Sequence, residues 1–229
     1  MTAPVPYKRE LIILTADLDA ETAVRGVLAR WKSLNIRKLD EGCDFDMHRH
    51  PQRDAGCRSA AEAFLESFVR THGHALVVFD HQGCGWEERS PEEVETDLES
   101  RLARTGWDGR CAAIVIAPEL EAWVWSNSPN VEIELGWSGR RPRLREWLVT
   151  ERLLAANAVK PADPKMAMER AMRQSRKPVS PHVFARLAET VGLNRCEDRA
   201  FLKLKRVLRN WFQANRPADC AKTDMDKQS

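Results

Sequence analysis

The stretch HALVVFDHQG, residues 74–83, decides the fold class that the sequence predicts. Its apolar run ends at Asp80 and passes into a polar, glycine-containing segment, which is typical of a short buried strand. The preceding stretch, SAAEAFLESFVRTHG, repeats apolar residues at helical spacing, with Ser59 as a candidate N-cap and Gly73 as a stop. A helix that leads into a buried strand is the repeating unit of an α/β fold.

The same alternation extends in both directions from this stretch. ELIILTAD (residues 10–17) predicts a first strand, and AETAVRGVLARWKSL (residues 20–34) predicts a helix after it, with Asp19 as a candidate cap. Downstream, SPEEVETDLESRLARTGW (residues 90–107) predicts a helix and CAAIVIA (residues 111–117) another strand. We therefore expect an α/β fold, with a mostly parallel sheet flanked by helices.

Composition places the chain among ordinary globular proteins. The 229 residues are 43% hydrophobic and 31% charged, enough for one buried core and an appended subdomain. No apolar run approaches the roughly 18 residues of a membrane span, and the N-terminus lacks the apolar core of a secretion signal. The six cysteines form no CxxC pair, which favours reduced thiols. We expect a cytoplasmic protein that does not bind membranes.

The charge of the chain is divided along its length. Residues 1–139 carry 15 basic and 24 acidic residues, a balance of −9, whereas residues 140–229 carry 21 basic and 10 acidic residues, a balance of +11. An acidic half that holds cations beside a basic half that holds phosphates would suit an enzyme acting on nucleic acid. Alternatively, the two halves attract each other within the monomer, or the basic helices have solvated faces.

Acidic residues follow each of the three predicted strands. Asp17 and Asp19 come after the first, Asp80 ends the second, and Glu119 and Glu121 come after the third. Ligands of parallel sheets bind at the carboxyl ends of the strands, so neighbouring strands would bring these groups to one edge. Clustered carboxylates that stay ionised usually hold a divalent cation, and oxygen-only ligation favours Mg²⁺ or Mn²⁺. Two-metal phosphodiester chemistry is the best-known use of such a site.

The order of these motifs carries a family resemblance. Strand then acid, strand then FDHQG, and strand then PELEAW resemble the Toprim-type domain of overcoming-lysogenization-defect nucleases. Over roughly residues 9–212, the chain is also similar to components of the bacterial methylation-associated antiphage defence system. The resemblance implies a Toprim-like domain with a Mg²⁺ or Mn²⁺ site that acts on nucleic acid. It also implies a role in phage resistance, with other defence-system proteins and DNA as partners.

The resemblance and the acidic strand ends together give candidate roles to individual residues. The candidate metal ligands offer side-chain oxygens and are Asp80, Gln82, Glu119 and Glu121. The candidate catalytic residues, which hold the cation or accept the proton of an attacking water, are Asp80, Glu121, Asp17 and Asp19. Two positions depart from the Toprim pattern: the first strand ends at Thr15 rather than glutamate, and the expected Asp-x-Asp is Asp80-His81-Gln82. Gln82 can bind a cation through its carbonyl oxygen but adds no charge.

The segment PELEAW, residues 118–123, has two interpretations. In the first, Pro118 begins a helix, and Glu119 and Glu121 lie near its positive end without any chemistry. In the second, a glutamate completes the acidic edge, and Glu121 is favoured because the resembling families carry a glutamate just ahead of a small residue and a Trp. Residues two apart on a helix point about 200° apart, so both glutamates face one metal only if the segment stays extended.

The stretch GCDFDMHRHPQRDAGC, residues 42–57, is expected to be a loop. The spacing of Cys43, His48, His50 and Cys57 matches no common zinc motif. A functional interpretation is that the loop carries candidate substrate-binding residues to the acidic edge, where an arginine clamps a phosphate and a histidine moves a proton. These candidates, with the histidine that follows Asp80, are His50, Arg53, Asp54 and His81. The alternative is a solvated loop whose charges pair with one another.

Beyond residue 140 the sequence predicts helices alone, with starts at Asp163-Pro164 and at Ser180-Pro181. We expect a Toprim-like domain over residues 1–139, a basic helical subdomain over 140–214 and a disordered tail over 215–229. The chain has no P-loop, nucleophile elbow or dinucleotide fingerprint. Two functions remain: a metal-dependent, nuclease-like subunit of a phage defence system, or a non-catalytic binding, assembly or sensor subunit of that system.

Overall fold

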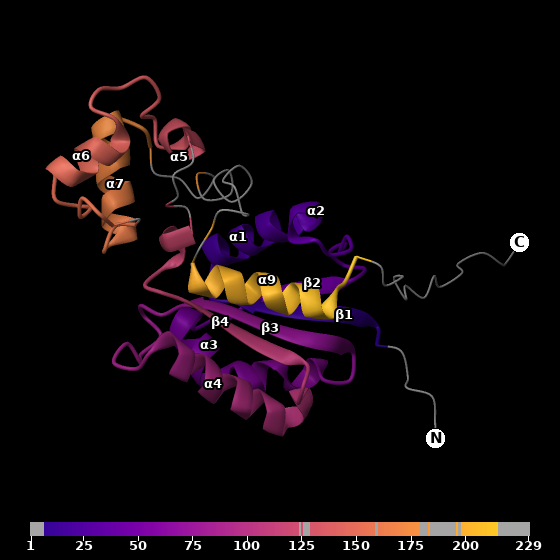
Figure 1. The fold of residues 1–229 in the computed structure, drawn as a ribbon. Coiled ribbons are helices and arrows are strands. Elements are labelled where there is room, and N and C mark those ends of the chain that lie inside the picture. Colours follow the sequence, from indigo (N-terminus) through magenta and orange to yellow (C-terminus); the bar gives the residue numbers. More distant parts are fainter. Residues whose placement is uncertain are drawn as a thin grey trace, which may run out of the picture.

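A four-stranded parallel sheet forms the centre of the protein (Figure 1). The computed structural model describes residues 7–123, 125, 129–158, 160–178, 183, 196 and 198–214. The strands are β1 (Arg9–Thr15), β2 (Phe45–Arg49), β3 (His72–Asp80) and β4 (Cys111–Ile116), in the order β2-β1-β3-β4. Every neighbouring pair is parallel. The expected α/β fold with helices flanking a parallel sheet is confirmed.

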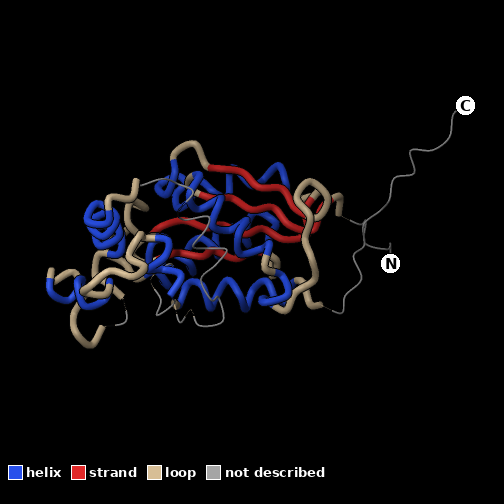
Figure 2. The backbone as a smooth tube through the Cα atoms, turned by 90° about the horizontal axis from the view of Figure 1, so that it is seen from above, coloured by secondary structure: helices blue, strands red, loops and turns tan. Residues whose placement is uncertain are grey.

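Both faces of the sheet carry apolar side chains, and helices cover each face. Successive strand residues alternate between two cores: Ile13 and Leu76 pack in one cluster, and Ile12 and Val77 in the other. One face is covered by α1 (Leu18–Ala29), α2 (Trp31–Leu34) and α9 (Arg199–Trp211). The opposite face is covered by α3 (Arg53–Leu65) and α4 (Pro91–Leu102), as Figure 2 shows from above.

A separate lobe lies beyond the carboxyl ends of the strands (Figure 1). It contains α5 (Pro129–Glu134), α6 (Leu144–Thr150) and α7 (Pro164–Ser175), which share a core of their own. The predicted start of α7 is confirmed, since the Asp163 side chain accepts from the N–H of Met166 at 2.8 Å. Helix α9 follows this lobe in the chain but packs on the sheet, through Phe201 and Leu204 among others. The expected helix start at Ser180-Pro181 and the tail at 215–229 lie outside the described residues.

The open edge of β4 is sealed by side chains instead of a further strand. Glu95 and Glu99, one helical turn apart on α4, accept hydrogen bonds from the N–H groups of Val115 and Ala113 at 2.9 Å each. Arg199 of α9 donates to the carbonyl of Val115 at 2.9 Å. The side chains thus satisfy the strand groups that a fifth strand would pair, which protects an exposed sheet edge.

Three local expectations are wrong. Residues 42–57 are not a loop, because β2 pairs along β1 and α3 begins at Arg53. Ser59 therefore lies inside a helix, and Gly73 lies in β3. Pairing with β1 gives residues 45–49 their strand conformation, and α3 begins seven residues before the start that a cap at Ser59 would give.

The cap of α1 also differs from the expectation. The cap is Asp17 instead of Asp19, with the Asp17 side chain accepting from the N–H groups of Asp19 and Ala20. Pro118 does not begin a helix either: a 3₁₀ turn runs over Leu120–Trp123. Both shifts amount to two residues, which is the ordinary uncertainty of a helix end read from sequence.

Among the described residues, no helix is long and apolar enough to cross a membrane.

Candidate functional site at the carboxyl edge of the sheet

The strand ends bring six carboxyl groups to one edge of the sheet. In sheet order, β1 is followed by Asp17, β3 ends at Asp80, and β4 is followed by the 3₁₀ turn that carries Glu121. The charges of Asp54, Glu121 and Asp17 all act on the carboxyl of Asp80, which shows that these groups lie close together. We use the name acidic edge for this set, which comprises Asp17, Asp19, Asp54, Asp80, Glu119 and Glu121.

Asp80 lies at the centre of the acidic edge. Its backbone N–H donates to Oδ1 of Asp54 at 2.9 Å, which ties the end of β3 to the first turn of α3. Its own Oδ1 is fully covered and has no hydrogen-bond partner. Burial, and then the charge of Asp54, raises the pKa of the Asp80 carboxyl well above its usual range. A hydrogen bond from the backbone of Leu120 opposes this shift, and a proton or a cation would stabilise the carboxyl group further.

The residues around the start of α1 combine a structural role with their charge. One oxygen of Asp17 caps the helix, accepting from the N–H groups of Asp19 and Ala20 at 3.0 Å each. Asp19 is half-buried, and its pKa is raised by burial and then by the charge of Asp17. The pKa of Asp54 is raised mainly by burial. These carboxyl groups therefore belong to the same electrostatic cluster as Asp80.

Both glutamates of PELEAW are buried, in contrast to the simple helix-start interpretation. Glu119 is 8% exposed and Glu121 is 6% exposed. Burial, followed by the charge of Glu119, raises the pKa of Glu121 to about 7. Glu119 directly precedes the 3₁₀ turn, and Glu121 lies within it. Of the two, Glu121 is the one coupled to Asp80.

Two basic side chains border the acidic edge. Lys165, in the first turn of α7, forms an ion pair with Glu119 at 3.6 Å. Burial lowers its pKa, but the charges of Glu119, Glu121 and Asp80 outweigh burial, and the net shift is upward. Arg53 is exposed at the start of α3, and its charge acts on both Asp19 and Asp54. Helix α7 of the lobe and helix α3 of the sheet layer thus each contribute a cation to the border of this site.

The histidines and Gln82 have other neighbours. His50 is 6% exposed, and its Nδ1 accepts from the N–H of Gln52 at 3.1 Å. Burial lowers the pKa of His50. The His81 ring bonds through Nε2 to the carbonyl of Arg89 at 2.9 Å and closes the loop after β3. Gln82 is exposed, and its backbone N–H donates to the carbonyl of Pro118 at 3.0 Å.

The acidic edge offers the oxygen ligands that a hard divalent cation prefers, but these ligands do not converge as a metal cage. All six groups of the acidic edge are carboxyls, and the covered Oδ1 of Asp80 lacks a partner. Within the part of the chain that the structure describes, however, no three His, Cys, Asp or Glu side chains converge as a ready-made metal cage. Mg²⁺ commonly binds through one or two carboxylates and several waters, so a full cage is not a requirement. Cys43 and Cys57 also form no zinc group with His48 and His50.

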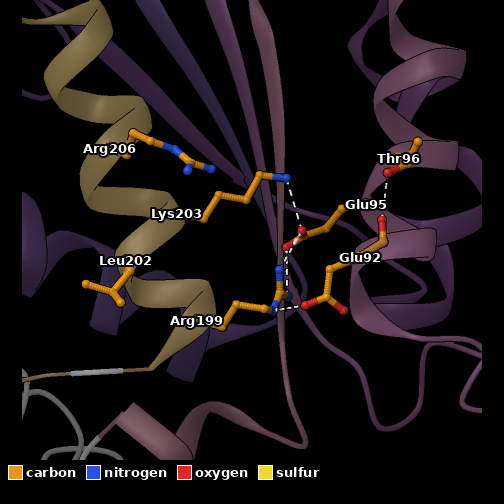
Figure 3. A pocket seen from close by; sticks show the side chains of 7 residues that line it. All are labelled: Glu92, Glu95, Thr96, Arg199, Leu202, Lys203 and Arg206. Carbon is orange, nitrogen blue, oxygen red and sulfur yellow. Dashed lines mark hydrogen bonds and ion pairs between the residues drawn. The ribbon is translucent and has the colours of Figure 1, made fainter.

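A concavity of about 460 Å³ opens at the sealed edge of β4 between α4 and α9 (Figure 3). Four of its charged side chains form ion pairs: Arg199 and Lys203 contact Glu95 at 2.7 and 3.0 Å, and Arg199 contacts Glu92 at 2.9 Å. Because these pairs join the two helices across the strand edge, we assign them to the stability of the fold.

The chain matches no protein-family model, no curated protein and no solved structure.

Sequence reasoning found all six carboxyls of this edge but missed Lys165. The charge count showed only that Lys165 lies in the basic half of the chain. The helix start at Asp163-Pro164 predicted a helix at Lys165 but not which residues its side chain contacts. No local signal in the sequence pairs it with Glu119, which lies 46 positions earlier in a different part of the fold.

Proposed function

We propose that the acidic edge binds Mg²⁺ or Mn²⁺ and acts on phosphodiester bonds of nucleic acid, as part of a bacterial defence against phage. The observation that carries the proposal is the Asp80 carboxyl, whose Oδ1 is covered, unpartnered and surrounded by the charges of Asp54, Glu121 and Asp17. Repulsion of this kind is relieved when a divalent cation binds, so the folded protein is poised to take one up. The order of acids along the chain, which resembles Toprim nucleases, gives the substrate class.

In such a reaction, different side chains would bind the cation, accept a proton and orient the phosphate. Asp80 and Glu121 would hold the cation, which supplies a Lewis acid for the phosphate and lowers the pKa of a bound water. Asp19, with its raised pKa, is suited to accept a proton from that water. Arg53 and Lys165 border the acids on two sides and would attract and orient a phosphate. The oxygen of Asp17 that is not used for capping remains a further acceptor.

Calorimetric titration with Mg²⁺ and Mn²⁺ tests the cation site directly. We expect the wild-type protein to bind, and Asp80→Asn to lose binding by about tenfold or more, because the variant removes one charge from the centre of the site. Asp108→Asn is the matched control, since Asp108 is exposed and precedes β4 at the opposite edge of the sheet. An absence of binding in the wild-type protein, or equal losses in the two variants, contradicts the proposal.

A non-catalytic binding, assembly or sensor role is the second candidate, and the end of β1 favours it. Where Toprim enzymes have a glutamate, Thr15 is fully buried, and its hydroxyl donates to the carbonyls of Asp17 and His48, both at 3.4 Å. A plaque assay with Asp80→Asn separates the two. Loss of both nuclease activity and phage resistance supports catalysis, whereas resistance that persists in a stably folded variant supports the non-catalytic role.

A further inference from the structure

The loop that follows β3, residues 81–89, builds an anion-binding nest. Gly83 and Gly85 have φ values of +86° and +82°, a conformation that favours glycine. This geometry turns the N–H groups of both glycines toward one point, where they donate to Oε1 of Glu87 at 2.8 and 3.1 Å. Alternate backbone N–H groups that converge in this way form a concavity for an anion.

The anion now in the nest is the protein's own. Glu87 is exposed, and hydrogen bonds from Gly85, from its own N–H and from Gly83 lower the pKa of its carboxyl. Among the ion pairs between described residues, none involves Glu87, so backbone N–H groups are what hold it. A solvent-facing carboxylate held in this way can be exchanged for another anion with oxygen acceptors.

Positive charge surrounds the nest. The guanidinium groups of Arg58 and Arg89 lie over the ring of Trp86, at 4.6 and 4.0 Å from its centroid. Arg58 also donates to the carbonyl of Cys84 at 2.8 Å, and its Nη2 lies 3.5 Å from the position that a Cβ would take on Gly85. Arg58 is therefore held beside the backbone donors by stacking and hydrogen bonding, and Arg89 stacks on the same Trp86 ring.

The nest adjoins the acidic edge. A Cβ on Gly83 would lie 3.8 Å from Oδ2 of Asp54, and the N–H of Gln82 donates to the carbonyl of Pro118. The bond from the His81 ring to the carbonyl of Arg89 closes the loop from the other end. The nest is therefore joined to the acidic edge on the side of Asp54.

We propose that this nest binds a backbone phosphate of nucleic acid, and that Glu87 occupies it until the phosphate replaces the carboxylate. The nest carries backbone donors and two arginines, which is the recognition chemistry of a phosphate. Its identity as a nucleic-acid site rests on the proposed function, whereas its affinity for phosphate does not. Glu87 thus acts as an internal competitor that weakens binding of free anions and yields to a polyanion held at several points.

Binding of two probes in EDTA tests this. The probes are inorganic phosphate, followed by calorimetry, and a fluorescent single strand of about 20 nucleotides, followed by anisotropy. We expect Glu87→Ala to bind both about tenfold more tightly than the wild-type protein, because the backbone donors become free. Glu88→Ala is the matched control, because this variant removes an equal charge from the exposed neighbouring residue without opening the nest. Glu88→Ala should change the affinity about twofold or less.

One further variant keeps the test decisive. Glu87→Gln leaves an acceptor in the nest and should fall between wild type and Glu87→Ala, which reports the nest even if the larger truncation loosens the loop. Because both probes are titrated in EDTA, whereas the cation site is tested with Mg²⁺ and Mn²⁺, failure of the nest and failure of the cation site are read separately. Equal binding by Glu87→Ala and Glu88→Ala overturns the proposal, and a gain for phosphate without a gain for the oligonucleotide overturns its nucleic-acid assignment.

Discussion

Glu121 shows how one buried carboxyl sets a pH dependence of stability. Its ordinary pKa is 4.5, and the folded protein raises it to about 7. Between these values the folded state binds a proton that the unfolded state does not bind. The free energy of unfolding therefore falls as the pH rises from about 4.5 to about 7, and this loss is complete above that range, at most about 3 kcal/mol.

We expect Glu121→Gln to remove this loss. In EDTA, urea denaturation should show that the variant is more stable than wild type at pH 8 and closest to it at pH 5. Glu88→Gln, at an exposed position, should leave the pH profile unchanged. A profile for Glu121→Gln that runs parallel to that of the wild-type protein would show that Glu121 does not titrate with a raised pKa.

Gly56 illustrates a steric requirement at a single residue. An alanine Cβ at Gly56 would lie 1.9 Å from Nδ1 of His50, so the ring or the helix must move. We expect Gly56→Ala to reduce the free energy of unfolding by about 1–3 kcal/mol, as overpacking of a buried site does. The double variant His50→Ala, Gly56→Ala should recover most of the cost of the alanine in a double-mutant cycle. Additive costs would show that the two residues do not compete for the same space.

At the residue scale, the sequence was most informative where polar groups follow apolar strands. Asp80 was predicted because it ends a buried strand, and Glu121 because it follows the next strand and matches a glutamate of the resembling families. His50 and His81 were placed near the site, but their contacts were not predictable, since the close approach to Gly56 and the bond to the Arg89 carbonyl depend on the packed backbone.

At the scale of elements, the side chains that cover the edge of β4 include both a buried and an exposed glutamate, and we expect their removal to cost different amounts of stability. Glu95 is 3% exposed and accepts from Val115, Arg199 and Lys203. We expect Glu95→Gln to lower the free energy of unfolding by about 2–4 kcal/mol, because two cations and a strand N–H lose their common acceptor charge. Chemical denaturation measures the loss.

Glu92→Gln is the matched control for this variant. Glu92 lies on the same helix and also pairs with Arg199, but its side chain is 56% exposed, so its loss should cost less than about 1 kcal/mol. Equal destabilisation by the two variants would contradict a sealing role for Glu95.

Elements with strong apolar periodicity were predicted well, and short mixed ones were not. The strands at 9–15, 72–80 and 111–116 each bury nearly every side chain, so their signal is continuous. Strand β2 is half exposed at an edge of the sheet, and its sequence FDMHR has little apolar content. Only pairing with β1 gives this segment its conformation, and pairing is a tertiary effect.

At the scale of the whole molecule, part of the opposite charge of the two halves of the chain is neutralised by ion pairs inside the monomer. Basic residues of the second half contact acidic residues of the first through Lys165 with Glu119, and through Arg199 and Lys203 with Glu95. This bears out the alternative in which the two halves attract each other. The basic excess beyond residue 140 therefore does not by itself indicate a nucleic-acid surface.

Lys165 links the lobe to the acidic edge, and its removal tests that link. Under the proposed function, Lys165→Ala should raise the affinity for Mg²⁺ about three- to tenfold, because one positive charge leaves the neighbourhood of the carboxyls. Calorimetry measures the change. Arg173→Ala removes a charge from an exposed position near the other end of α7 and should leave the affinity unaltered. An equal effect of both variants would mean that only net charge matters.

The contribution of α9 to the sheet has a consequence for synthesis on the ribosome. Among the described residues, the last strand ends at Ile116, yet the helix that completes one apolar face and helps to seal β4 begins at Arg199. While the intervening residues are being translated, the part of this face that α9 covers is exposed, and the β4 edge lacks its Arg199 contact. Nascent chains in this state are prone to aggregate and are natural clients of chaperones. Truncation before α9 should thus yield a protein that depends on chaperones for solubility.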